Sequence, residues 1–146
     1  MDITRFFQYM VAQEASDLFL KTNSRPAIRV DGKIRFIADM PLSQENMWDA
    51  FDKLLDETCK ENFEEIGAAD FALSLPNIGR FRANVFRHMS QHGMVFRHVQ
   101  SKIPSFQELN LPVQGMEKLA NLSRGLVLAT GIAGSGKSTS LASLLQ

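Results

Sequence analysis

The residues with the clearest chemical meaning lie in a glycine-rich segment near the C-terminal end of the chain. Residues 131–138 read GIAGSGKS and meet the pattern G-x-x-x-x-G-K-[ST] in full. Glycines in such a loop let backbone N–H groups converge on phosphate oxygens. Lys137 can reach the β- and γ-phosphates of ATP, Ser138 can offer its hydroxyl to Mg²⁺, and Thr139 can touch the α-phosphate. The pattern predicts a nucleotide site formed by Gly131, Gly134, Ser135, Gly136, Lys137, Ser138 and Thr139.

The segments on either side of this loop are those expected around a phosphate-binding turn. The apolar run 125–130 predicts a short strand that leads into the loop. The run 138–145 predicts a helix, whose N-terminus would add partial positive charge beside the phosphates. A glycine-rich structural turn is the alternative interpretation, and the flanking strand and helix patterns argue against it.

Two arginines in the middle of the chain form a second candidate site. Segment 80–86 reads RFRANVF and predicts a strand in which Arg80 and Arg82 share one face and the apolar side chains share the other. If this strand pairs with the next one across the segment 87–93, Arg82 and Arg97 lie close together. Two guanidinium groups repel unless an anion lies between them, and a γ-phosphate would serve. The alternative is a solvated basic sheet face whose arginine stems cover apolar surface.

The elements that must position these arginines follow from the hydrophobic pattern of the first hundred residues. The dipeptide Asp31-Gly32 predicts a tight hairpin, and Ser43 can cap a helix. The turn at Pro76-Asn77 separates two further strands. Helices are predicted over residues 2–14, 43–57 and 60–65, and strands over 17–21, 27–30, 33–37, 70–75, 80–86 and 94–99.

The chain is therefore predicted to contain an α/β domain and the start of a second domain. The first domain covers residues 1–100, a linker with a short helix near 113–122 covers 101–123, and the phosphate-loop domain starts at 124. One strand and one helix cannot cover a parallel sheet, and no helix stop signal precedes Gln146. We expect the chain to be the N-terminal part of a longer protein.

The overall composition argues against several classes of protein. Apolar residues make up 45% and charged residues 22%, a balance typical of a soluble globular chain, and a net charge of zero gives no sign of nucleic acid as a partner. Cys59 is the single cysteine, so no internal disulfide can form. His88 and His92 are expected in a loop without metal-ligand spacing. No signal peptide or membrane span is indicated, so a cytoplasmic location is expected.

Several short motifs resemble the secretion and pilus-motor ATPases, and among them the type IV pilus retraction ATPases of the PilT/PilU group. The likeness runs from about residue 3 to residue 146, with the motifs in the family order. The matching pieces are Ala15-Ser16-Asp17-Leu18, Arg29-Val30-Asp31-Gly32, Asp70-Phe71, the strand from Arg80 to Phe86, Val95-Phe96-Arg97, Arg124-Gly125-Leu126-Val127 and the phosphate loop.

This resemblance implies a PAS-like N-terminal domain followed by a RecA-like P-loop ATPase domain. It implies a homo-hexamer that binds ATP and Mg²⁺ between the two domains and drives pilus retraction and twitching motility. Lys137, Arg82 and Arg97 would be its catalytic residues in this chain, with the two arginines sensing phosphate. The implied partners are an inner-membrane platform protein of the pilus and a paralogous retraction ATPase, which would hold the motor at the membrane.

The chain departs from the family pattern at several positions. Phe19 replaces a common histidine, Ser90 replaces a loop arginine, and Ile132-Ala133 replaces Pro-Thr. The acidic residues that activate water lie beyond residue 146 in the family pattern, so we expect the chain alone to be inactive. Two alternatives remain open, a pilus-assembly or type II secretion ATPase and a non-catalytic interaction fragment. The start directly at the first domain and the single cysteine favour the retraction group.

Overall fold

The structure is a computed structural model that describes residues 2–89, 91–99, 102–132 and 134–146. Its internal contacts divide the chain into two compact units, Met1–Gln100 and Ser101–Gln146. Across the described ranges, no helix has the length and apolar character needed to cross a membrane.

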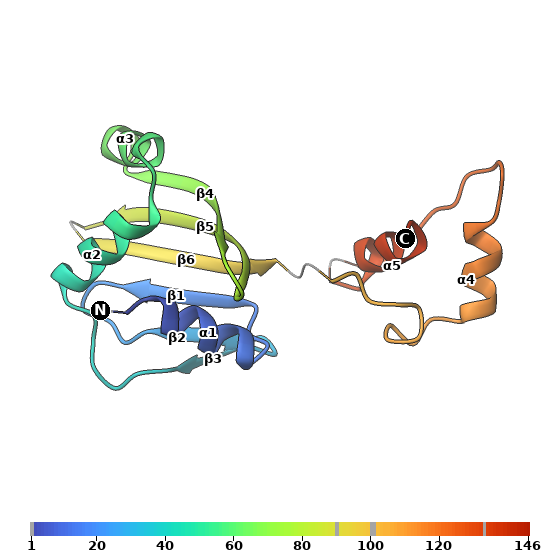
Figure 1. Ribbon diagram of the computed structural model, residues 1–146, viewed down its shortest axis with the longest axis horizontal. Helices are drawn as coiled ribbons and strands as arrows, with labels where there is room; N and C mark the ends of the chain where they lie inside the picture. Colours follow the sequence, from blue (N-terminus) through green and yellow to red (C-terminus); the bar gives the residue numbers. More distant parts are fainter. Residues whose placement is uncertain (1, 90, 100–101, 133) are drawn as a thin grey trace. The chain divides into compact units, whose positions relative to one another are not determined.

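The first unit is built on one six-stranded antiparallel sheet with the strand order β3-β2-β1-β6-β5-β4 (Figure 1). Asp31 and Gly32 join two neighbouring strands with φ angles of 49° and 75°, the positive values that a tight hairpin turn needs, so the predicted hairpin is confirmed. The predicted mixed α/β class is also confirmed. The strands are β1 Asp17–Lys21, β2 Ala27–Val30, β3 Lys33–Phe36, β4 Ala68–Leu75, β5 Gly79–His88 and β6 Gln91–Val99.

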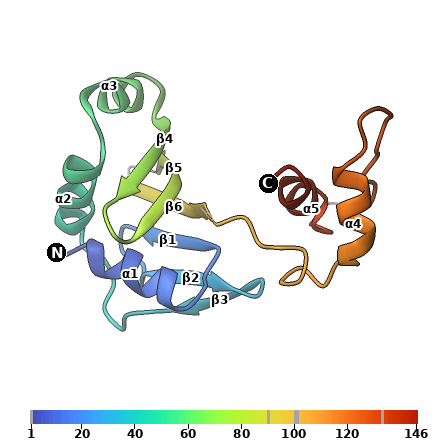
Figure 2. The same cartoon turned by 45° about the vertical axis from the view of Figure 1, so that its right-hand side comes forward.

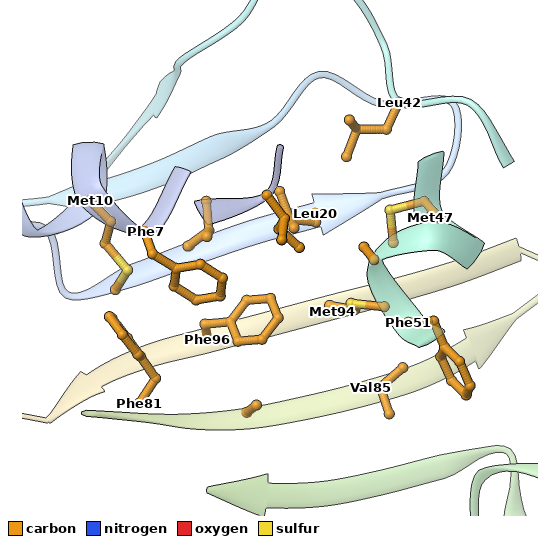
Figure 3. Close-up of a cluster of buried hydrophobic side chains, with 14 of the residues drawn as sticks. Phe7, Met10, Leu20, Leu42, Met47, Phe51, Phe81, Val85, Met94 and Phe96 are labelled. Carbon is orange, nitrogen blue, oxygen red and sulfur yellow. The ribbon is translucent and has the colours of Figure 1, made fainter. Parts of the chain in front are cut away.

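Three helices contribute apolar side chains to a core on one face of this sheet. They are α1 Thr4–Ala12, α2 Gln44–Leu54 and α3 Glu57–Ile66. The Phe7 ring of α1 is fully buried, and its centroid lies 4.8 Å from the ring centroids of both Phe81 and Phe96 (Figure 3). Since side chains alternate along a strand, this packing leaves Arg82 and Arg97 on the opposite face of the sheet.

Side chains close the N-terminal ends of α2 and α3. The Asn46 N–H donates to Ser43 Oγ at 3.1 Å, and the Ser43 N–H donates to Asn46 Oδ1 at 3.3 Å. This reciprocal pair satisfies two helix-terminal donors and confirms Ser43 as the predicted cap. At α3 the Cys59 N–H donates to Asp56 Oδ1 at 2.8 Å. Both N-terminal ends are therefore capped by side chains, and the chain passes directly from α2 into α3 (Figure 2).

The predicted loop 87–93 is largely wrong, because most of these residues continue β5 and β6. His88 pairs with Gln91, and Arg87 pairs with His92. Polar side chains favour a loop, but a backbone ladder at the end of a hairpin requires no apolar residues. The two histidines thus lie in strands, and Ser90, named above as a departure, lies outside the described residues.

The second unit contains two helices, α4 Val113–Ala120 and α5 Lys137–Leu144. The strand predicted over 125–130 is wrong, since no strand forms there. Leu126 is 83% exposed and Leu128 is 73% exposed. A strand needs a neighbour to accept its backbone hydrogen bonds, and none is found among the described residues of this unit.

Candidate functional site

The phosphate loop has the backbone conformation that its glycines predict. Gly131, Gly134 and Gly136 have φ angles of 152°, 78° and 86°, in the region that disfavours residues with a Cβ. A Cβ added at Gly131 would lie only 2.7 Å from Ser135 Oγ. Ala133, one of the departures from the family pattern, lies outside the described residues. The three glycines therefore permit a turn that most other residues would strain.

The loop leads directly into the N-terminus of α5. Gly136 occupies the N-cap position and no side chain caps this end, so the first-turn N–H groups remain available as donors. Lys137 begins the helix, and its Nζ donates to the Ile132 carbonyl oxygen at 2.5 Å, folding back over the loop. Such an end, with a positive dipole and an ammonium group above it, suits a phosphate.

Ser138 and Thr139 follow in the first turn of α5, and both are exposed. A serine hydroxyl is a neutral oxygen ligand of the kind that Mg²⁺ accepts together with phosphate oxygens and water. The donor set of this turn therefore fits a magnesium–nucleotide complex.

The two predicted arginines lie directly opposite each other on neighbouring strands. The β5–β6 register pairs Arg82 with Arg97, which confirms that they are adjacent. Side chains at opposed positions typically have Cβ atoms about 5 Å apart. Arg80 pairs instead with Val99 and Ser74, two residues further along the strand.

This arginine pair belongs to a straight row that crosses all six strands, which we call the arginine row. In sheet order its members are Ala72, Arg82, Arg97, Asp17, Arg29 and Ile34. The row contains three positive side chains and one negative side chain. It therefore carries a net positive charge, which the rest of the chain balances to a formal net charge of zero.

Asp17 is the centre of this row and binds an arginine on either side. Arg97 Nε donates to Asp17 Oδ1 at 3.0 Å, and Arg29 Nε donates to Asp17 Oδ2 at 3.1 Å. Ser16 Oγ also donates to Oδ2, at 2.8 Å. The Asp17 side chain is only 6% exposed, whereas the Arg97 side chain is 70% exposed. A buried carboxylate thus anchors an arginine that remains largely in solvent.

A shallow hollow of about 480 Å³ covers one end of the arginine row. Arg82 lines the hollow and is exposed. It has no ion-pair partner among the residues that the structure describes. Asn84 Nδ2 donates to Asp70 Oδ1 at 3.0 Å at the rim. The hollow is lined by Asp17, Asp70, Arg82, Asn84, Val95 and Arg97, among others. The hollow therefore brings Arg82 and Arg97 together with the carboxylates of Asp17 and Asp70.

Reasoning from the sequence alone missed the role of Asp17. The segment around Asp17 belongs to the motifs that resemble the pilus-motor family, but no contact was predicted for it. A signal was present, because an acidic residue opening a strand on the face opposite Leu18 and Leu20 calls for a partner. The partners are set by strand register, which the sequence pattern does not specify.

Known proteins resemble this chain over its full length. No protein-family model matches it. The chain is 38% identical over 146 residues to the type IV pilus retraction ATPase PilT of Pseudomonas aeruginosa, covering 100% of this chain and 42% of that protein. It is 36% identical over 145 residues to the type IV pilus ATPase PilU of the same organism, covering 99% of this chain and 38% of that protein.

A solved structure of the pilus retraction motor PilT with bound ADP matches with a TM-score of 0.84 and 35% identity, covering 99% of this chain and 42% of that one. The chain is thus related to the motor ATPases of type IV pili. More closely, it is a relative of the PilT and PilU ATPases, as the sequence motifs indicated. It spans about two fifths of the length of the curated relatives it matches.

Proposed function

We propose that this chain is the ATP-binding portion of a hexameric motor ATPase that powers type IV pilus retraction and twitching motility. The observation that carries the proposal is the complete phosphate loop at the uncapped N-terminus of α5. Its relatives are named as retraction and pilus ATPases, and one of them is a motor with bound ADP.

In this proposal the two units are a PAS-like domain and the beginning of a RecA-like ATPase domain. The first unit has an antiparallel sheet with its helices contributing to one core face, which suits a PAS-like domain. The second unit carries the loop and helix with which a RecA-like domain binds phosphate. The domain limits remain 1–100, 101–123 and 124–146.

The proposed roles of the residues follow from their charges and positions. Lys137 exchanges the Ile132 carbonyl for β- and γ-phosphate oxygens, and the first-turn N–H groups of α5 bind the same phosphates. Ser138 would hold Mg²⁺, which neutralises charge on the phosphates when bound. Arg82 and Arg97 stabilise the negative charge that develops during hydrolysis.

The proposed setting is the cytoplasmic side of the inner membrane, where the motor contacts the pilus platform protein and a paralogous retraction ATPase. In the family pattern, the residues that activate water lie outside the 146 residues of this chain. The chain alone is therefore proposed to bind Mg²⁺–ATP without turning it over.

The test of this function compares two arginines of the same strand in the complete ATPase that contains this chain. Arg82→Ala removes a side chain of the hollow, and turnover should fall by roughly 10²-fold or more with little change in melting temperature. Arg80→Ala is the matched control, because Arg80 is also exposed on the same face but lies outside the hollow.

Steady-state phosphate release and thermal unfolding measure these two effects. Equal turnover in the Arg82→Ala and Arg80→Ala proteins would remove Arg82 from the site. Mg²⁺-dependent turnover by the purified 146-residue chain would contradict the proposed division of the active site.

A further inference from the structure

We propose that Asp17 is an internal counter-ion that holds Arg97 when no nucleotide is bound, and that a polyphosphate must compete with Asp17 for this arginine. Asp17 would then be a positioning residue that sets both the resting place of Arg97 and the charge of the anion that can release it. The inference rests on the proposed function, because it takes Arg82 and Arg97 as phosphate-binding arginines.

The resting contact turns Arg97 toward β1, on the side away from Arg82. Arg97 lies between Arg82 on β5 and Asp17 on β1 in the arginine row. Its Nε donates to Asp17 Oδ1 at 3.0 Å, while most of the side chain remains in solvent. The contact separates two like charges that strand pairing would otherwise bring together.

Asp17 can release Arg97 without becoming an unpaired buried charge. Its other oxygen accepts from Arg29 Nε at 3.1 Å and from Ser16 Oγ at 2.8 Å. Breaking a buried ion pair is costly when it leaves one ion uncompensated. Here Arg29 and the Ser16 hydroxyl stay bonded to Oδ2, so the carboxylate keeps one arginine partner when Oδ1 gives up Arg97 to a phosphate.

The charge of the row determines which anions can compete. The row has three positive arginines and one negative carboxylate, so its net charge is plus two. A singly charged anion can bind Arg82 alone, but to bind Arg97 it must displace a carboxylate of equal charge. An anion with two or more charges can bind Arg82 and Arg97 together. The row should therefore select polyphosphates over chloride or other monoanions.

The experiment measures tripolyphosphate binding to the 146-residue chain by calorimetry at fixed ionic strength. Every protein carries Lys137→Ala, which weakens the phosphate loop as a second binding site. Asp17→Asn keeps the shape of the side chain and removes its charge. It should bind tripolyphosphate about tenfold more tightly, because the competitor for Arg97 is lost.

Asp70→Asn is the matched control, since Asp70 lines the same hollow but holds Asn84 rather than an arginine. It removes the same charge and should tighten binding by only about twofold. Equal gains in the Asp17→Asn and Asp70→Asn chains would overturn the inference, because they would show a general charge effect.

Arginine Nε–H resonances give a second readout, which a purely structural role of Asp17 would not move. Tripolyphosphate should shift the Arg97 Nε–H signal as this arginine leaves Asp17, and the Arg29 signal should stay nearly constant. Joint movement of both signals, or of neither, would overturn the inference. If Asp17→Asn fails to fold, this measurement on the protein with native Asp17 still decides.

Failure of the phosphate-binding role proposed for the two arginines has a different signature. In that case Arg82→Gln with Arg97→Gln would leave tripolyphosphate binding unchanged in the Lys137→Ala chain. Loss of binding in that double variant, with no difference between Asp17→Asn and Asp70→Asn, would retain the arginine site and reject only the role of Asp17.

Discussion

The two units of the chain hold their candidate phosphate-binding groups in different ways. In the first unit, Arg97 is anchored by a buried carboxylate on a sheet with its own apolar core. In the second unit, Lys137 lies on a helix of eight residues, and Ser143 is the only buried residue among those described. The first set of charges is positioned by packing, and the second by the local conformation of a glycine-rich loop.

This difference explains which site the sequence reveals. A phosphate loop works through backbone groups and local turns, so the predicted residues lie within nine consecutive positions, 131–139. The arginine pair works through strand register, so its two members lie 15 positions apart, from 82 to 97. The first can be identified by a short pattern, whereas the second requires the fold.

The largest expected effect is on the free energy of unfolding, and it tests the contrast between the packed first unit and the largely exposed second unit. Phe7→Ala removes a fully buried ring that contacts Phe81 and Phe96, and should lower the free energy of unfolding by about 3–5 kcal/mol. Leu128→Ala, at a side chain that is 73% exposed, should change it by less than about 0.5 kcal/mol. Urea unfolding followed by circular dichroism measures both, and similar losses would contradict the contrast.

A smaller effect on stability is expected at the helix N-termini, because the two units also differ in how these ends are capped. Ser43 caps α2 with its side chain, whereas α5 has no side-chain cap. Ser43→Ala should lower the free energy of unfolding by about 1 kcal/mol, since it leaves a helix-terminal donor without its acceptor. Gln44→Ala in the adjacent exposed position is the control. No loss in thermal unfolding for Ser43→Ala would show that the reciprocal pair contributes nothing in solution.

The smallest effect concerns pH. Burial, together with the charge of Arg87, lowers the pKa of His92 below its usual 6.5. The unfolded chain then binds more protons than the folded chain as the pH falls through 6.5, so stability decreases toward acid. His92→Phe should remove this part of the slope between pH 7 and pH 5, while retaining a ring beside Trp48, whose centroid lies 4.5 Å away.

The second unit should show no such change over this interval. The Lys102 ammonium and the Ser105 backbone and hydroxyl groups lower the pKa of Glu108 to about 2. A depressed carboxyl pKa gives stability that is lost only as the pH falls below the unfolded value of 4.5. Stability measured from pH 7 to pH 5 on the His92→Phe chain and the parent isolates the contribution of His92. Identical slopes would exclude His92.

Much of the fold follows from local patterns, and the errors have specific physical causes. The strands β1 and β2 and the Asp31-Gly32 hairpin were predicted from alternation and turn chemistry, which act over a few residues. The polar segment 87–93 was misread because backbone pairing there depends on the opposite strand. The strand predicted over 125–130 did not form because pairing needs a neighbour as well as apolar residues.

The candidate site shows the same distinction between features set by local sequence and contacts set by the fold. The glycines and Lys137 were predicted from spacing, and the adjacency of Arg82 and Arg97 was predicted because a hairpin fixes which residues face each other. The ion pairs of Asp17 with Arg29 and Arg97 involve strands that are distant in sequence. No periodicity within one strand specifies which strand will lie beside it.

The apolar segment before the phosphate loop has a practical consequence for handling the chain in solution. Leu126, Val127 and Leu128 are 83%, 41% and 73% exposed. The backbone groups of these three residues have no hydrogen-bond partner in the part of the chain that the structure describes, so the segment can pair with its copy in another molecule. Concentrated samples should therefore self-associate through this segment, and a charged residue in place of Val127 should delay precipitation while leaving the sheet unit unchanged.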